Sequence, residues 1–209
     1  MKIRQSSPSL VSYVALAALT LGLGACGGDA SEPVFQDPPA PGETPTAAAP
    51  AADAAGGTLI AAGIALDMPA DWQQQPSESN MRLAQAAIPG SGGDGLLTVF
   101  FFGVGGGGTA QMNLDRWAGQ IAAEAGAEAS TSVEQAGDYT IHFVEHRGTL
   151  KASSISFPET DQPGYALLGA VIEGPGGPWF LKSVAPEATM AEQADAFRAM
   201  VRSVRPADA

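Results

Sequence analysis

Two histidines and a glutamate stand at the spacing of an inverted zinc-protease signature. His142, Glu145 and His146 lie in the segment YTIHFVEH, and that chemistry needs both histidines on one helical face with the glutamate as base. The β-branched and aromatic residues predict a strand instead. On a strand, residues i and i+4 share a face about 13 Å apart, too far for one Zn²⁺ with ligand bonds of about 2 Å. We expect two exposed or half-exposed strand histidines, Glu145 on the opposite face, and neither a metal site nor a cofactor.

A glycine-rich segment matches the dinucleotide-binding pattern GxGxxG. Gly103–Gly108 (GVGGGG) follows an apolar run and precedes a predicted helix, where backbone N–H groups can hold a phosphate. Five glycines in six residues satisfy the pattern by composition alone, and no acidic residue ends a second parallel strand to bind a ribose. We expect a loop whose Gly105 and Gly106 are candidates for contacting an anion or gating a groove.

Arginines and tryptophans supply the other candidates for a ligand or partner surface. The structural alternative places each tryptophan in the core, and Arg82 in solvent or beside an acid such as Asp67, while Arg116 could form a polar edge with Asp115. Trp179 and Phe180 alternate along a strand, so one of them is expected to be exposed. No GxSxG elbow occurs, although carboxylate pairs for sugar hydrolysis need no short spacing. The candidates are Trp72, Arg82, Arg116, Trp117 and Trp179, together with Gly105 and Gly106.

Hydrophobic periodicity predicts the elements that position these residues. A hairpin around Gly63 is expected to end at the turn Pro69–Trp72, and LLTVFFF (96–102) reads as a central strand buried on both faces. A helix is predicted from an Asn113 N-cap to Gly126, and a second over 190–204 with a Thr189–Glu192 capping box. The other predicted strands are 81–88, 139–144 with an extension to 150, 165–172 and 179–184. We expect an α+β fold: a mostly antiparallel sheet covered by two main helices, an α/β/α sandwich.

This element order, with Met68-Pro69-Ala70-Asp71-Trp72 after the hairpin, resembles the PsbP-like fold over about residues 58–205. The resemblance implies that sandwich and a domain that binds or assists other macromolecules without catalysis. It carries no functional residue onto this chain.

The N-terminal segment resembles a bacterial lipoprotein signal. Lys2 and Arg4 precede an apolar run from Leu10 to Leu23, and Leu23-Gly24-Ala25-Cys26 forms a lipobox with the only cysteine of the chain. The resemblance implies cleavage before Cys26, lipidation of its thiol, and anchoring in the cell membrane or outer membrane, the outer membrane being favoured by Gly27. The alternative is an ordinary signal peptide with an incidental cysteine.

Composition divides the chain into a signal peptide (1–25), an anchored spacer (26–57), one α+β domain (58–205) and a short tail (206–209). The spacer is rich in Ala and Pro without apolar periodicity, which predicts disorder. The net charge is −12 at pH 7 and becomes −14 once Lys2 and Arg4 are removed. That balance argues against nucleic-acid partners and against docking on anionic lipid.

Together these features predict a lipid-anchored cell-envelope protein with a non-catalytic binding or accessory domain. Its partner would be another envelope protein or a small ligand, and its oligomeric state stays open. The alternatives are a periplasmic hydrolase with a cryptic site and a purely structural envelope component.

Overall fold

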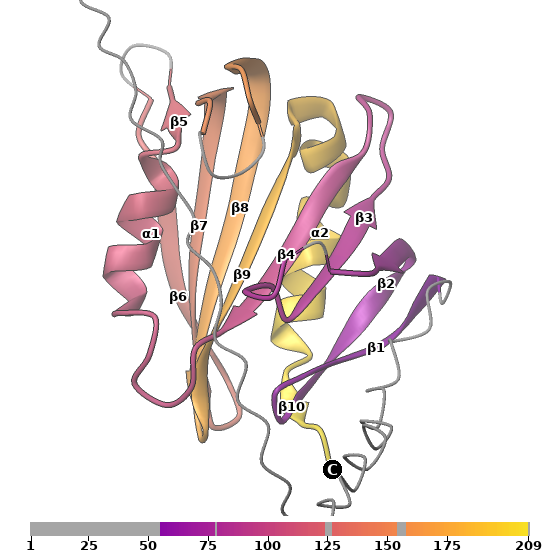
Figure 1. The fold of residues 1–209 in the computed structure, drawn as a ribbon, viewed down its shortest axis with the longest axis vertical. Coiled ribbons are helices and arrows are strands. Elements are labelled where there is room, and N and C mark those ends of the chain that lie inside the picture. The colour runs from indigo at the N-terminus through magenta and orange to yellow at the C-terminus, as the bar shows by residue number, and fades with distance from the viewer. Residues whose placement is uncertain (1–54, 78, 124–126, 154–157, 209) are drawn as a thin grey trace, which may run out of the picture. The chain divides into compact units, whose positions relative to one another are not determined.

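Ten strands form one antiparallel sheet in the computed structural model, which describes residues 55–77, 79–123, 127–153 and 158–208 (Figure 1). Their order across the sheet is β1-β2-β3-β4-β9-β8-β7-β5, with β10 pairing β2 and β6 pairing β7. The strands are β1 Ala55–Ala61, β2 Ile64–Gln75, β3 Ala84–Ile88, β4 Gly95–Phe101, β5 Ile121–Ala122, β6 Ser130–Ala136, β7 Tyr139–Leu150, β8 Gln162–Gly174, β9 Gly177–Pro186 and β10 Arg205–Pro206. The helices are α1 Ala110–Ala118 and α2 Glu187–Arg202.

A tight turn joins β1 to β2 at one edge of the sheet. Ala62 and Gly63 both have positive φ, 48° and 90°, as a two-residue hairpin turn of type I′ requires. The hairpin predicted around Gly63 is therefore confirmed, as are the strand running to Leu150 and the β8–β9 hairpin.

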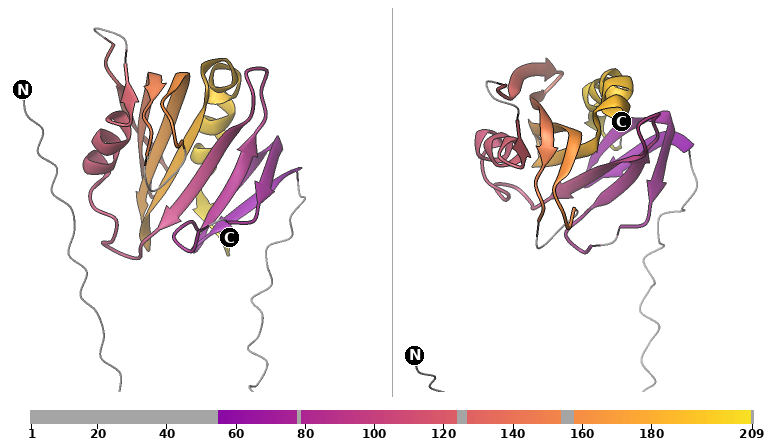
Figure 2. Two further views of the ribbon diagram at one scale, coloured as in Figure 1. Left: turned by 45° about the horizontal axis from the view of Figure 1, so that its top comes forward. Right: turned by 90° about the horizontal axis from the view of Figure 1, so that it is seen from above.

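The two helices pack on opposite faces of the sheet (Figure 2). Residues that alternate along each strand divide between two hydrophobic clusters, because successive side chains of a strand point to opposite faces. The α2-side cluster holds Trp72, Phe143 and Trp179 with Phe197 of α2. The α1-side cluster holds Val144, Val171 and Phe180 with Leu114 and Trp117 of α1. We call these two surfaces the α2 face and the α1 face.

The predicted α/β/α sandwich with two main helices is wrong, because the sheet dominates the fold. Helix α1 has nine residues and ends at Ala118, whereas the sequence predicted it to reach Gly126. Gly119 and Gln120 instead turn the chain into β5. The unpredicted strand β6 is exposed or half-buried along its whole length. Such an edge strand carries no buried alternation for a sequence reading to detect.

Strand β2 also continues where the sequence predicted its end. Pro69 lies within β2, at the point where the register with β1 shifts between Met68 and Gln73. Proline lacks the N–H that a regular ladder needs, but a strand irregularity tolerates it. The strand predicted over 81–88 begins only at Ala84.

Both predicted helix caps are corrected. Thr109, not Asn113, caps α1, with its side chain accepting a hydrogen bond from the Met112 N–H at 3.2 Å. Helix α2 begins at Glu187 without a side-chain cap. Thr189 is buried and donates to the Gly93 carbonyl at 2.6 Å, so it fastens the β3–β4 loop to the helix. The predicted buried stripe of α2 is confirmed at Phe197 and Val201.

Residues 1–54 lie outside the described residues, and with them Cys26, the predicted signal peptide and most of the predicted spacer. Among the described residues, neither helix is long and apolar enough to cross a membrane.

Candidate functional site

Part of the α1 face carries no helix. Trp117 packs against β8 and β7, and Gly169 of β8 makes room for it: a Cβ at Gly169 would lie 2.5 Å from Trp117 Cε3. The contacts of α1 with the sheet are concentrated on β7 and β8. The same face of β9, β4 and β3 extends beyond the helix (Figure 1).

This arrangement corrects the prediction that strand 96–102 is buried on both faces. Leu97 and Val99, on the α2 face, are fully buried, whereas Phe100 is only half-buried and Phe102 is 49% exposed. We call the uncovered region the open sheet face. It consists of Leu83, Phe100, Phe102 and Lys182, which are exposed or half-buried, and of Gln85 and Thr98, which are only 3% and 5% exposed, and it is bordered by Arg82, Arg116 and Gln120.

Polar residues of three neighbouring strands form a row across the open sheet face. Gln85 of β3 pairs with Thr98 of β4, which pairs with Lys182 of β9. The Thr98 hydroxyl donates to the Lys182 carbonyl oxygen at 3.1 Å. Because neighbouring strands are about 4.8 Å apart, the row spans about 10 Å. Gln85 and Thr98 each interrupt an otherwise apolar strand, and Lys182 is the only charged residue of β9.

Lys182 is the cation of this row and lies at its β9 end. Its ammonium donates to Gln120 Oε1 at 3.0 Å, so it is held by a neutral amide. Burial, then the charges of Arg116 and Arg82, lower the pKa of Lys182 from 10.5 to about 8. Lys182 is therefore a cation at neutral pH in a place that disfavours a cation.

The two arginines bordering the row also contact amides. Arg116 donates to Asn113 Oδ1, and Asn113 is itself buried and fixed by a hydrogen bond to the Gly107 carbonyl at 2.9 Å. Arg82 donates to Gln85 Oε1 at 2.9 Å. Within the described part of the chain, no ion pair involves Lys182 or Arg116. Positive charge thus gathers on one surface of a chain whose net charge is −12.

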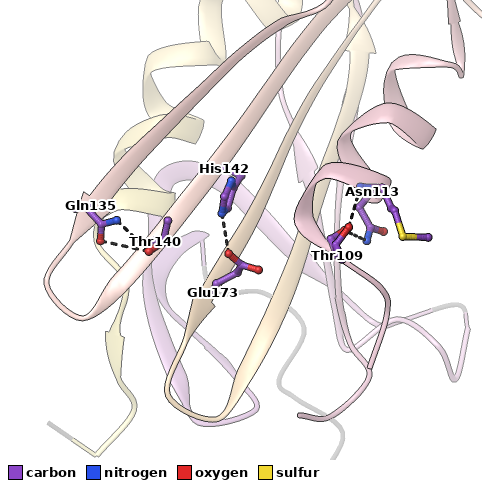
Figure 3. Close-up of polar contacts among 7 residues, drawn as sticks. Thr109, Asn113, Gln135, Thr140, His142 and Glu173 are labelled. Carbon is purple, nitrogen blue, oxygen red and sulfur yellow. Dashed lines mark hydrogen bonds and ion pairs between the residues drawn. The ribbon is translucent and has the colours of Figure 1, made fainter. Parts of the chain in front are cut away.

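The glycine loop of residues 103–108 has a packing role. A Cβ at Gly107 would lie 2.5 Å from Phe180 Cε2, and one at Gly106 would lie 2.2 Å from the Phe102 carbonyl oxygen. The loop then enters α1 at Thr109, as Figure 3 shows with Asn113 beside it. Strand β4 is antiparallel to both neighbours, so the βαβ setting of a dinucleotide fingerprint does not occur here. Gly105 lies in the open part of this loop.

The histidines lie on a strand, as predicted, but only His142 is half-buried: His146 is buried, which corrects the expectation that both are exposed or half-exposed. His142 and His146 belong to the α1 face of β7, and His142 Nε2 lies 2.7 Å from Glu173 Oε2 on β8 (Figure 3). Glu145 lies on the α2 face, where Arg198 donates to its carboxylate at 2.9 Å. The strand therefore separates Glu145 from the histidines, which is incompatible with the zinc-protease arrangement.

All three tryptophans of the predicted surface are buried. Trp72 is fully buried and its indole N–H donates to Gln193 Oε1 at 2.9 Å. Trp179 and Phe180 are each 1% exposed, which corrects the prediction that one of them reaches solvent. Trp117 is buried but holds α1, and hence Arg116, beside the open sheet face. Of the predicted residues, the structure brings together Arg82 and Arg116 and leaves Trp72 and Trp179 in the core.

Two hollows elsewhere hold arginines that already have carboxylate partners. One, of about 510 Å³, lies at the end of α2 and includes Arg202 and Arg205. The other, of about 610 Å³, includes Arg147. These arginines pair with Glu134, Asp67 and Glu145 at 2.7, 2.7 and 2.6 Å. An anion entering either hollow would have to compete with a carboxylate of the chain.

The sequence reading missed Lys182, Thr98, Gln85 and Gln120. A signal for three of them exists: Gln85 and Thr98 are single polar residues inside apolar strands, and Lys182 is the only charged residue in an apolar stretch that also holds Ser183. Their alignment depends on strand order and register, which a single sequence does not specify. Gln120 follows the end of α1, which the sequence placed six or more residues too late.

No family model matches the chain, and no curated protein matches it. A crystal structure of a protein from Bacteroides thetaiotaomicron VPI-5482 is similar, with a TM-score of 0.42 and 13% sequence identity. The similarity covers 73% of this chain and 48% of that one, so this chain spans about half the length of that protein.

Proposed function

We propose that the chain is an exported lipoprotein whose domain binds a small organic anion on the open sheet face, without catalysis. One observation carries the binding proposal: Lys182 and Arg116 meet there with neutral amide partners. Lys182 is half-buried and Arg116 is exposed. A cation that is taken out of water is ordinarily paired, yet neither of these two is paired with a carboxylate of the described chain. A bound anion would supply the missing charge and accept their hydrogen bonds.

The charge distribution favours a small anion over an acidic macromolecule. A chain of net charge −12 repels nucleic acid and acidic proteins at long range. A small carboxylate reaches the polar row without bringing more negative charge near the rest of the surface.

The binding proposal is tested with the Cys26→Ser chain, which lacks the thiol that would carry lipid. Titration calorimetry at pH 7 would measure its affinity for butyrate. Lys182→Met is expected to weaken binding by about tenfold, because a hydrogen bond to a charged group is lost. Lys151→Met is the matched control, since Lys151 is an exposed lysine paired with Asp161 at 3.1 Å. Equal affinity in the Lys182→Met chain, or no binding at all, would contradict the proposal.

The anchoring proposal rests on the lipobox at Leu23–Cys26 and needs its own test. Mass spectrometry of the mature N-terminus should find Cys26 as the first residue, carrying acyl chains. Two or three acyl chains hold a protein firmly on a membrane, so Cys26→Ser should release the chain from the membrane fraction. An unmodified Cys26 in the wild-type chain would refute the anchor and leave the binding proposal standing.

A further inference from the structure

We infer that the anion bound on the open sheet face carries an apolar arm, so that the ligand is an anionic amphiphile of the medium-chain carboxylate class. This inference rests on the proposed function and extends it from the charged group of the ligand to the apolar part of the same molecule. It is carried by a second group of side chains on the same face, next to the polar row.

That second group is an exposed apolar strip formed by Leu83, Phe100 and Phe102. Leu83 is 44% and Phe102 is 49% exposed, and Phe100 is half-buried. The Leu83 N–H donates to the Val99 carbonyl at 2.8 Å, which places Leu83 beside β4. Exposed apolar residues that gather on one surface mark binding sites more often than scattered ones do.

The strip is held in shape before any ligand arrives. The rings of Phe100 and Phe102 stack with centroids 6.3 Å apart and planes 12° apart. Phe102 also contacts the buried Phe180 at a centroid distance of 5.8 Å. The loop lies against these rings at Gly107, where a Cβ would come within 2.8 Å of Phe102 Cδ2. Little side-chain entropy would therefore be lost when an apolar chain covers the strip.

The strip begins where the polar row ends. Thr98, Phe100 and Phe102 follow one another on the same face at intervals of two residues. At about 3.3 Å per residue, Phe100 lies about 7 Å and Phe102 about 13 Å along β4 from Thr98. A carboxylate at Lys182 and Arg116 would thus direct its alkyl chain along Phe100 and Phe102. The two groups together fit one molecule with a charged head and an apolar arm.

The experiment compares chain lengths at constant charge. Calorimetry on the Cys26→Ser chain at pH 7 would measure binding of butyrate, octanoate and the neutral octanol below their aggregation limits. Octanoate should bind about tenfold more tightly than butyrate, because each buried CH₂ contributes to affinity, and octanol should bind more weakly than octanoate. Phe102→Ser should remove most of the gain from chain length, so that octanoate affinity falls much more than butyrate affinity.

Two further variants keep the test interpretable. Leu83→Ser repeats it at a second exposed position in case Phe102→Ser unfolds. Val133→Ser is the matched control, since Val133 is 62% exposed on β6, at the other end of the sheet. It should leave every affinity unchanged.

Each outcome separates the two proposals. A chain-length gain that Phe102→Ser or Leu83→Ser abolishes supports the inference. Equal affinity for butyrate and octanoate, both lost in Lys182→Met, overturns the apolar arm and leaves anion binding intact. Octanol binding as tightly as octanoate also overturns the amphiphile. Absence of binding by either carboxylate refutes the proposed function, and the inference with it.

Discussion

The basic side chains at the C-terminal end of α2 and just beyond it differ from those of the open sheet face in the groups they hydrogen-bond. Arg198, Arg202 and Arg205 each bind a carboxylate of the chain, at 2.9, 2.7 and 2.7 Å. Lys182 and Arg116 bind the amides of Gln120 and Asn113. The ion pairs of the first group connect α2 and the segment after it to strands of the sheet. The positive charges of the second group are not neutralised by a carboxylate of the described chain.

In a chain of net charge −12, the difference separates cations that pair with a carboxylate of the chain from cations that remain available to an external anion. Carboxylates are abundant, so a cation beside an amide is not explained by a shortage of acids. The charges of Arg116 and Arg82 further lower the pKa of Lys182. Such an arrangement destabilises the folded protein unless an anion binds, which is typical of a functional site.

The largest effect should follow from displacing α1, which holds Arg116 at the open sheet face. Gly169→Val should destabilise the fold by about 3 kcal/mol, because the new side chain would overlap Trp117 and Val144. Gly119→Ala is the matched control: its Cβ would meet nothing closer than 3.4 Å, so stability should hardly change. Denaturant unfolding measures both. A Gly169→Val chain as stable as wild type would show that α1 is not seated as described.

Lys182→Met should stabilise the protein at neutral pH while weakening anion binding. Below pH 8 Lys182 is charged in both folded and unfolded chains, and the folded chain bears the unfavourable burial of that charge. Between about pH 8 and pH 10.5 the folded chain has released the Lys182 proton while the unfolded chain still holds it. The free-energy penalty of burying this charge therefore shrinks as pH rises through that range. The variant should gain about 1 to 3 kcal/mol at pH 7 and almost nothing above pH 10.5. A loss of stability at pH 7 would contradict this account.

Arg198→Ala should destabilise the fold and leave anion binding unchanged, which is the reverse of the effect expected for Lys182→Met. It removes the half-buried pair with Glu145 and the contact of the guanidinium with the Phe143 ring, 5.3 Å from its centroid. We expect a loss of about 1 to 2 kcal/mol of unfolding free energy and no change in butyrate affinity. A weaker affinity for butyrate in a folded Arg198→Ala chain would contradict the distinction between the two groups of cations.

Arg202→Gln should have the smallest effect. Its guanidinium hydrogen-bonds both oxygens of the Glu134 carboxylate, which lowers the Glu134 pKa. This contribution is present above the ordinary pKa of a glutamate and is lost as pH falls through the lowered value. Because the pair is largely exposed, we expect a loss of about 0.5 kcal/mol at pH 7, shrinking in salt. A loss several times larger, or one that persists at pH 2, would be inconsistent with a surface pair.

Much of the strand content could be predicted from the sequence, whereas the layer arrangement could not. Apolar runs and turn residues located β4, β7, β8 and β9, as well as the first hairpin. The edge strand β6 carries no burial pattern, and the short α1 stops at a glycine that the sequence reading passed over. The sequence therefore predicted an α/β/α sandwich, whereas the described fold is dominated by one large antiparallel sheet.

The candidate site shows the same limit. Arg82 and Arg116 could be selected because charged residues stand out near predicted apolar elements. Their meeting around Lys182 requires β4 to pair with β9 across most of the domain's sequence length. The apolar run 96–102 suggested two covered faces, and only the short helix left one of them open.

The pKa of Lys182 tests the central claim most directly. Lys2, Lys151 and Lys182 are the only lysines of the chain, so a ¹³C spectrum of labelled lysine side chains contains at most three signals to titrate, and Lys182→Met identifies the signal of Lys182. We predict that Lys182 titrates near pH 8 in the free Cys26→Ser chain and at higher pH when octanoate is added, while Lys151 stays unchanged. An ordinary value near 10.4 in the free chain, or no response to the anion, would contradict the account.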